Sequence, residues 1–345
     1  MATPDKYIRL TLDDNPFVTT EGVTRMPSLV APPDQRIVKI ERNFYLRGYV
    51  SKVGSVGAIR DYSITDNYNS VYSKDLSSED LYWLKWIARF ASVQNLQILN
   101  QTDLTNRLFK MRQAWSSINR LQRLGLVQRW LYDHPVQKEK VGVYTLTGNG
   151  WRFMMSFYPE DHYFNPMRFW TLPSNIHLRF WQMVDVYQLM ESLPAFHDYN
   201  TMFNGFPRDQ KMISSSPLQI ALEIQPKHIV NLVFYSLLES DSSDYYKDAC
   251  EKWSKLTDAG KNITFKIPNL PYGQGITNAI AFYSPTYEYA NKVSTDLMLS
   301  KWGFSSLFLI GENIKTEGVA KAFYMPDRAT SNLVRLTLPT LIKEK

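Results

Sequence analysis

Hydrogen-bond donors suited to phosphates and base edges share one face of a predicted helix in the middle of the chain. The spacing predicts a helix from Met111 to Leu124, in which Ala114, Ile118 and Leu121 follow the i, i+4, i+7 repeat of a buried face. The opposite stripe carries Gln113, Ser116, Ser117, Arg120 and Arg123. Hydroxyl, amide and guanidinium groups are the donors that proteins direct at nucleic acids. The stripe therefore favours nucleic-acid binding.

The charge distribution also favours nucleic-acid binding. Eight basic residues and two acidic ones, Asp133 and Glu139, lie between Leu104 and Lys140, so this window carries the whole net charge of +6. The basic residues are Arg107, Lys110, Arg112, Arg120, Arg123, Arg129, Lys138 and Lys140. A basic surface on an otherwise neutral protein is typical of nucleic-acid binding, and an acidic protein partner would suit it too.

We expect two sets of contacts with duplex DNA. The residues expected to face the major groove are Gln113, Ser116, Ser117 and Arg120. Those expected to hold phosphates are Arg112, Arg123, Lys138 and Lys140.

The elements around this helix predict a small domain. Gly125 ends the helix, since glycine readily adopts the positive φ of a helix C-terminus. Strands are predicted over Leu126–Trp130 and Val143–Leu146, joined by a polar hairpin tip at His134–Lys140. The motif Thr147-Gly148-Asn149-Gly150 then begins another helix.

Two helices are predicted upstream. The first begins at the capping signal Ser77-Ser78-Glu79-Asp80 and ends near Phe90. Its expected buried residues are Leu81, Leu84, Ile87 and Ala88. The second is a short helix from Ser92 to Asn100. The order is therefore helix, helix, helix, strand, strand, helix.

The span from about Ser77 to Phe157 resembles the winged helix-turn-helix domains of bacterial DNA-binding proteins. The residues that carry the likeness are Ile118 to Val127 and Tyr144 to Gly150. The helix at His177 and the stretch from Pro207-Arg208-Asp209 to Glu223 look like the replication-relaxation family of plasmids and integrative elements. In that family a winged helix precedes a nuclease-like α/β domain.

The resemblance implies a non-enzymatic protein of a mobile genetic element. Such a protein would recognise an origin of plasmid replication or conjugative transfer and recruit a partner enzyme, a relaxase or a replication protein. A homodimer would fit, because DNA-binding domains of this kind commonly pair to bind two half-sites. Transcriptional regulation and protein binding through the winged helix are alternatives.

The chain as a whole predicts a mixed α+β and α/β protein with four parts. An N-terminal arm with short strands covers residues 1–76, the DNA-binding domain 77–157, an aromatic linker 158–175 and a mixed-sheet α/β domain 176–345. The linker aromatics, among them Tyr158, Phe164 and Phe169, would stack unpaired bases or, as we favour, pack against the flanking domains.

The α/β domain is predicted from alternating segments. Its expected helices are Ile176–Leu193, Ser242–Ala259 and Thr286–Trp302. Its expected strands are Leu218–Ile224, Ile229–Tyr235, Ile263–Ile267, Asn278–Tyr283 and Ser306–Ile310.

One set of residues supports an enzymatic alternative. Asp209 and Glu223, with a nearby lysine, are the types that Mg²⁺-dependent nucleases use to bind metal and polarise water. Gln225 stands two residues beyond Glu223, where such enzymes carry lysine, and Lys227 lies four beyond. The alternative assigns metal-dependent cleavage to Asp209 and Glu223.

Other chemistry has little support in the sequence. The Gly273-Gln274-Gly275 turn lacks the Lys-Ser/Thr of a phosphate-binding loop, and the five histidines have no metal-ligand spacing. Cys250 is the only cysteine and reads as a small buried residue. We therefore expect no cofactor and no metal.

The composition excludes some protein classes. With 44% hydrophobic and 14% aromatic residues, the 345-residue chain can bury substantial cores. Met1 to Val30 has no continuous apolar stretch, and the longest apolar run, Ile229–Leu238, is about half a membrane span. We expect a cytoplasmic protein without membrane association.

Overall fold

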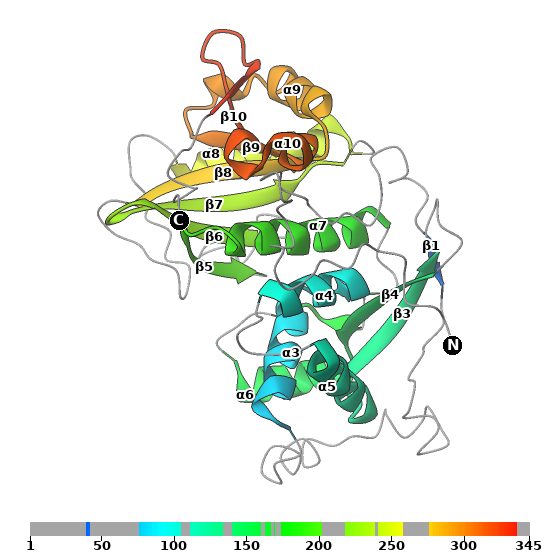
Figure 1. Ribbon diagram of the computed structural model, residues 1–345. Helices are drawn as coiled ribbons and strands as arrows, with labels where there is room; N and C mark the ends of the chain where they lie inside the picture. The colour runs from blue at the N-terminus through cyan, green and yellow to red at the C-terminus, as the bar shows by residue number, and fades with distance from the viewer. Residues whose placement is uncertain are drawn as a thin grey trace. The chain divides into compact units, whose positions relative to one another are not determined.

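The computed structural model describes residues 39–41, 76–104, 111–133, 140–159, 163–166, 169, 174–201, 218–238, 241–257 and 276–336 (Figure 1). The density of contacts divides the chain into two units, and the division falls between Val184 and Asp185. This point lies inside a helix, downstream of the predicted linker at residues 158–175. Both units mix helices and strands, as expected.

Unit 1 is built from helices around a small antiparallel sheet. Its elements are β1 (Lys39–Glu41), α3 (Ser78–Arg89), β2 (Val93–Gln94), α4 (Asn95–Leu104), α5 (Met111–Arg123), β3 (Val127–Asp133), β4 (Lys140–Leu146), α6 (Gly148–Phe157) and the first part of α7 (Ser174–Glu191). The sheet order is β1-β3-β4-β2. β3 and β4 pair from Val127 opposite Leu146 to Asp133 opposite Lys140.

The predicted capping signal does begin α3. The Ser77 hydroxyl accepts a hydrogen bond from Asp80 N at 3.1 Å, and Ser77 N donates to Asp80 Oδ2 at 2.9 Å. Leu84, Ile87 and Ala88 are buried, as the periodicity predicts, whereas Leu81 is only half-buried. α3 packs directly against α5.

One predicted helix begins later than expected because of tertiary pairing, and it ends later too, at Leu104. The sequence predicts a helix from Ser92 onward, but residues 93–94 form strand β2 and α4 begins at Asn95. Val93 pairs with Tyr144 of β4, and the Ser92 hydroxyl accepts a 2.6 Å hydrogen bond from Trp181 Nε1. Both contacts are long-range, so local helical spacing could not reveal them.

Gly125 ends α5 as predicted, with φ at +68°. The Leu126 N–H donates to Leu121 O at 2.9 Å and the Gly125 N–H to Gln122 O at 3.1 Å, which is the Schellman pattern of helix termination. The chain leaves this turn directly into β3.

The Thr147–Gly150 motif connects β4 to α6 and contacts the same turn. Thr147 caps α6 by accepting a 2.9 Å hydrogen bond from Gly150 N, while its own N–H donates to Leu126 O at 3.0 Å. A Cβ on Gly150 would lie 2.0 Å from that same Leu126 oxygen. Only glycine therefore fits where α6 crosses the end of α5.

Unit 2 contains one seven-stranded mixed sheet in the sequential order β11-β10-β9-β8-β7-β6-β5. Its elements are the rest of α7, β5 (Phe196–Thr201), β6 (Leu218–Gln225), β7 (His228–Ser236), α8 (Ser243–Thr257), β8 (Ile276–Ser284), α9 (Tyr287–Asp296), η5 (Leu299–Lys301), β9 (Ser306–Ile310), α10 (Gly311–Glu317), η6 (Val319–Lys321), β10 (Phe323–Pro326) and β11 (Leu333–Arg335). The strands β7, β8 and β9 run parallel, and the remaining neighbours are antiparallel. Figure 1 shows β5, β6, β7 and β8 side by side in chain order.

An apolar cluster holds α8 and α9 on the sheet of unit 2. Trp253 and Cys250 of α8 and Ala290 of α9 pack with strand residues such as Phe282 and Phe308. α8 and α9 are the connections between the parallel strands, so the βαβ geometry places them against the sheet.

Most predicted elements of unit 2 are confirmed, and one ends earlier than predicted. The strand predicted over Ile263–Ile267 lies outside the described residues and stays a prediction. The helix predicted to reach Trp302 ends at Asp296, because Met298 adopts a left-handed φ of +48° and a 3₁₀ turn follows. The periodicity did not predict β5, α10, β10 or β11. In the part of the chain that the structure describes, no helix combines the length and apolarity of a membrane span.

Candidate nucleic-acid interface

The outward face of α5 is polar along its described length. Its exposed side chains are Gln113, Ser116, Asn119, Arg120 and Arg123. On the opposite face Ala114, Ile118 and Leu121 are buried, which confirms the predicted inward stripe. The helix therefore presents amide, hydroxyl and guanidinium groups to solvent on a rigid support.

Ser117 does not belong to this face. The sequence places it on the outward stripe, but only 5% of Ser117 is exposed. It lies three residues after Ala114 and four before Leu121, so helical geometry puts it beside two buried neighbours. A hydroxyl in this position faces the packed side of α5, and the expectation that Ser117 contacts bases is wrong.

Arg120 connects α5 to α3. Its Nη1 lies 3.3 Å from Asp80 Oδ2, and the exposed fractions of the two side chains are 53% and 2%. Asp80 also closes the capping box of α3, so one carboxylate serves both contacts. Burial raises the pKa of the adjacent Glu79, and a hydrogen bond from Trp83 opposes that shift. Arg120 thus has a structural partner besides any ligand.

The hairpin of β3 and β4 adds a cation that the sequence assignment did not single out. A Cβ on Gly142 would lie 2.7 Å from Arg129 Nε and Nη2 and 2.8 Å from Asn95 Nδ2. The guanidinium of Arg129 therefore lies across Gly142, beside the first residue of α4. Arg129 lies opposite Tyr144 in the hairpin, and the Tyr144 ring contacts Trp115 of α5. The face of the hairpin that carries Tyr144 therefore packs against α5.

The remaining predicted phosphate contacts are only partly described. Arg112 lies in the first turn of α5, and Lys140 is the first residue of β4, opposite Asp133. Their side chains, and Lys138 entirely, lie outside the described residues. Arg123 is exposed in the last turn of α5.

The aromatic segment after α6 packs within unit 1. Phe169 is fully buried and its ring contacts Trp130 of β3 at 5.3 Å and His177 of α7 at 4.5 Å between centroids. Phe164 contacts Phe180 at 5.4 Å. These rings therefore support the hairpin and α7, as we favoured over base stacking.

Of the two acidic residues in the nuclease alternative, the structure describes Glu223. Glu223 is exposed at the end of β6, and its Oε1 accepts a 3.1 Å hydrogen bond from Lys227 N. Lys227 adopts a φ of +64° in the same hairpin turn. Asp209 lies outside the described residues, among which no cluster of three metal-ligating side chains occurs. Glu223 therefore has a local role in its turn.

Unit 2 has a cavity of about 440 Å³ at the end of the sheet where β7, β8 and β9 begin. Its walls are mainly apolar, with Leu222, Leu232 and Phe323 among them. Among the described residues, its charged or titratable lining side chains are those of Arg328 and His228.

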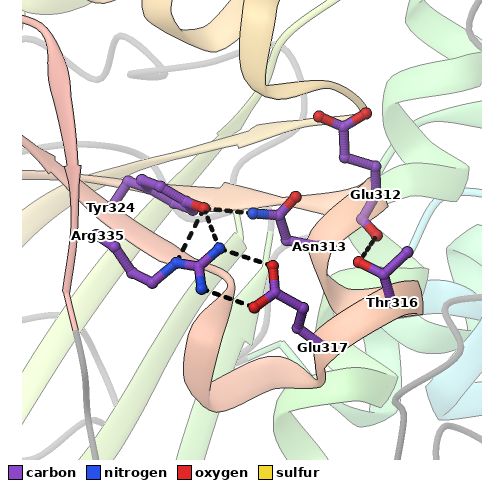
Figure 2. Close-up of polar contacts among 6 residues, drawn as sticks. All are labelled: Glu312, Asn313, Thr316, Glu317, Tyr324 and Arg335. Carbon is purple, nitrogen blue, oxygen red and sulfur yellow. Dashed lines mark hydrogen bonds and ion pairs between the residues drawn. The ribbon is translucent and has the colours of Figure 1, made fainter.

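A polar cluster fastens the last strand of unit 2 (Figure 2). Arg335 of β11 forms two hydrogen bonds with Glu317 of α10, at 2.6 and 2.7 Å, and two more with the Tyr324 hydroxyl of β10. The hydrogen bonds from Arg335 lower the pKa of Glu317. Asn313 also donates to Tyr324. The cluster connects α10, β10 and β11, and its polar groups form hydrogen bonds with one another.

Cys250 lies in α8 and is fully buried, as the sequence predicts. Burial raises the pKa of its thiol to about 12. We expect Cys250 to react with Ellman's reagent at pH 8 only when the protein is unfolded in guanidinium chloride, because the reactive thiolate is scarce and covered in the native state. Rapid modification without denaturant would contradict this assignment.

Comparison of the chain with protein-family models, with curated proteins and with solved structures gives no significant match.

Proposed function

We propose that unit 1 is a winged helix-turn-helix module and that the protein binds duplex DNA with α5 in the major groove. Support comes from the element order α3, β2, α4, α5, β3, β4, in which two helices precede an outward-facing third and a hairpin follows it. In helix-turn-helix proteins the helix in this place enters the groove, and flanking elements contact the backbone.

The observation that carries the proposal is the exposed face of α5. Every exposed side chain described on this helix is polar or cationic, and the helix has no acidic residue. An exposed helical face of this kind can pair with phosphates and base edges without burying an unpaired carboxylate. The exposed Arg123 at the end of α5 and the half-buried Arg129 of β3 add positive charge.

The biological setting follows from the resemblance to the replication-relaxation family. We infer a protein of a mobile genetic element that recognises an origin for replication or transfer and recruits a relaxase or replication protein. It would act in the cytoplasm, and a homodimer would place two α5 helices on two half-sites. Catalysis would reside in the partner enzyme.

The test is a titration of full-length protein against a fluorescent random-sequence duplex, followed by polarisation at several salt concentrations. With about four phosphate contacts per protomer, affinity should fall roughly 100-fold between 50 and 200 mM salt, because each contact releases condensed counterions. A site selected from a random library should bind more tightly than the starting pool.

Two outcomes would contradict the proposal. Absence of binding to any duplex at 50 mM salt would remove DNA as the partner. Binding that does not change with salt would be inconsistent with phosphate contacts from a basic surface. Either result would favour a protein partner for α5 instead.

A further inference from the structure

Asn119 is an exposed polar residue near the middle of α5. It makes no hydrogen bond, ion pair or ring contact with the described residues. Because the side chain of Asn119 contacts no polar group in the described part of the chain, its amide is available to a ligand. The initial assignment of groove-facing residues omits it.

Helical geometry places Asn119 on one side of the exposed face, next to Ser116 and Arg123. It lies three residues after Ser116 and four before Arg123, both of which are exposed. At about 100° per residue, these three positions fall within roughly 60° of one another around the helix axis. Asn119 and Arg123 are separated by roughly 6 Å along the axis, which is about two base-pair steps.

Two residues assigned to base contacts from the sequence fit that role less well. Ser117 is buried on the packed side of α5. Arg120 is exposed, but its guanidinium makes an ion pair with Asp80 of α3. The neighbouring exposed residues Ser116, Asn119 and Arg123 are therefore the candidates for contacts with DNA.

The amide of asparagine carries a donor and an acceptor side by side. This arrangement matches the N6 donor and N7 acceptor that adenine presents in the major groove, whereas a hydroxyl pairs with any base. We infer that Asn119 is a specificity-determining residue that pairs with an adenine in the DNA site, with Arg123 on an adjacent phosphate. This inference rests on the proposed function.

The test compares site preferences of three full-length proteins by selection from a random duplex library. Wild-type protein should select a site with one strongly preferred A·T pair. Asn119→Ala should lose preference at that pair only, and its affinity for the wild-type site should fall about 5- to 100-fold. Asn119→Asp should shift the preference at the same pair toward cytosine, whose N4 group donates to a carboxylate.

Arg123→Ala is the matched control on the same face. It should weaken binding to selected and random duplexes alike and reduce the salt dependence by about one counterion, with the site preference unchanged. Thermal unfolding should be the same for all variants, since both residues are exposed.

The outcomes separate the inference from the proposed function. If wild-type protein selects a site and Asn119→Ala selects the same site with the same affinity, the role of Asn119 is wrong while DNA binding stands. If wild-type protein selects no site and binds no duplex, the proposed function itself is wrong.

Discussion

Replacement of Gly150 by alanine is expected to destabilise unit 1 by roughly 3 kcal/mol or more. The added methyl group would lie 2.0 Å from Leu126 O and 2.9 Å from Leu126 C, which are backbone atoms. They cannot move away without loss of the 3.0 Å hydrogen bond from Thr147 N and of the turn that ends α5. Urea unfolding followed by tryptophan fluorescence measures the change.

Gly303→Ala is the matched control. Gly303 also resists substitution, but through its φ of +73° alone, because a Cβ there meets no atom within 4 Å. We expect a cost of about 1 kcal/mol for that conformation. Equal losses of stability at the two positions would show that the close approach of Gly150 to the Leu126 backbone is not the reason why position 150 requires glycine.

The double variant Arg120→Ala/Arg123→Ala is expected to lose about 2–4 kcal/mol of DNA-binding free energy, or roughly 30- to 1000-fold in affinity. Both guanidinium groups lie on the exposed side of α5 and would contribute phosphate or base contacts. Polarisation titrations at constant salt with the selected duplex measure the loss.

A structural effect of Arg120 must be separated from a binding effect. Removal of Arg120 takes away the ion pair of the buried Asp80 carboxylate, which keeps its hydrogen bond from Ser77 N. We therefore expect the free energy of unfolding to fall by about 1 kcal/mol as well. Asp80→Asn breaks the ion pair but keeps an oxygen for the cap. If Asp80→Asn reproduced the full loss of affinity, disruption of α3 and α5 would explain the result better than DNA contacts.

Local signals in the sequence were sufficient for elements whose contacts are near in the chain. The capping box at Ser77, the glycine at the end of α5 and the buried stripe of Ala114, Ile118 and Leu121 all depend on residues within one or two helical turns. The same holds for the strands β6, β7, β8 and β9, whose apolar runs mark them as buried.

Elements that depend on distant partners were not predicted. β2 exists because Val93 pairs with β4, and the edge strands β10 and β11 are short, with few residues to show a period. One contact of the candidate interface also depends on a distant partner. Helical spacing does place Ser117 beside the buried Ala114 and Leu121, but it does not reveal that Arg120 meets Asp80, forty residues earlier.

By itself, the sequence determined that α5 is amphipathic, that its outward side is basic and that a hairpin follows it, because charge and periodicity are local properties. Only the tertiary structure decided which of those outward residues remain available, since burial and ion pairing depend on what packs alongside. For this reason Asn119 replaces Ser117 among the candidate contact residues.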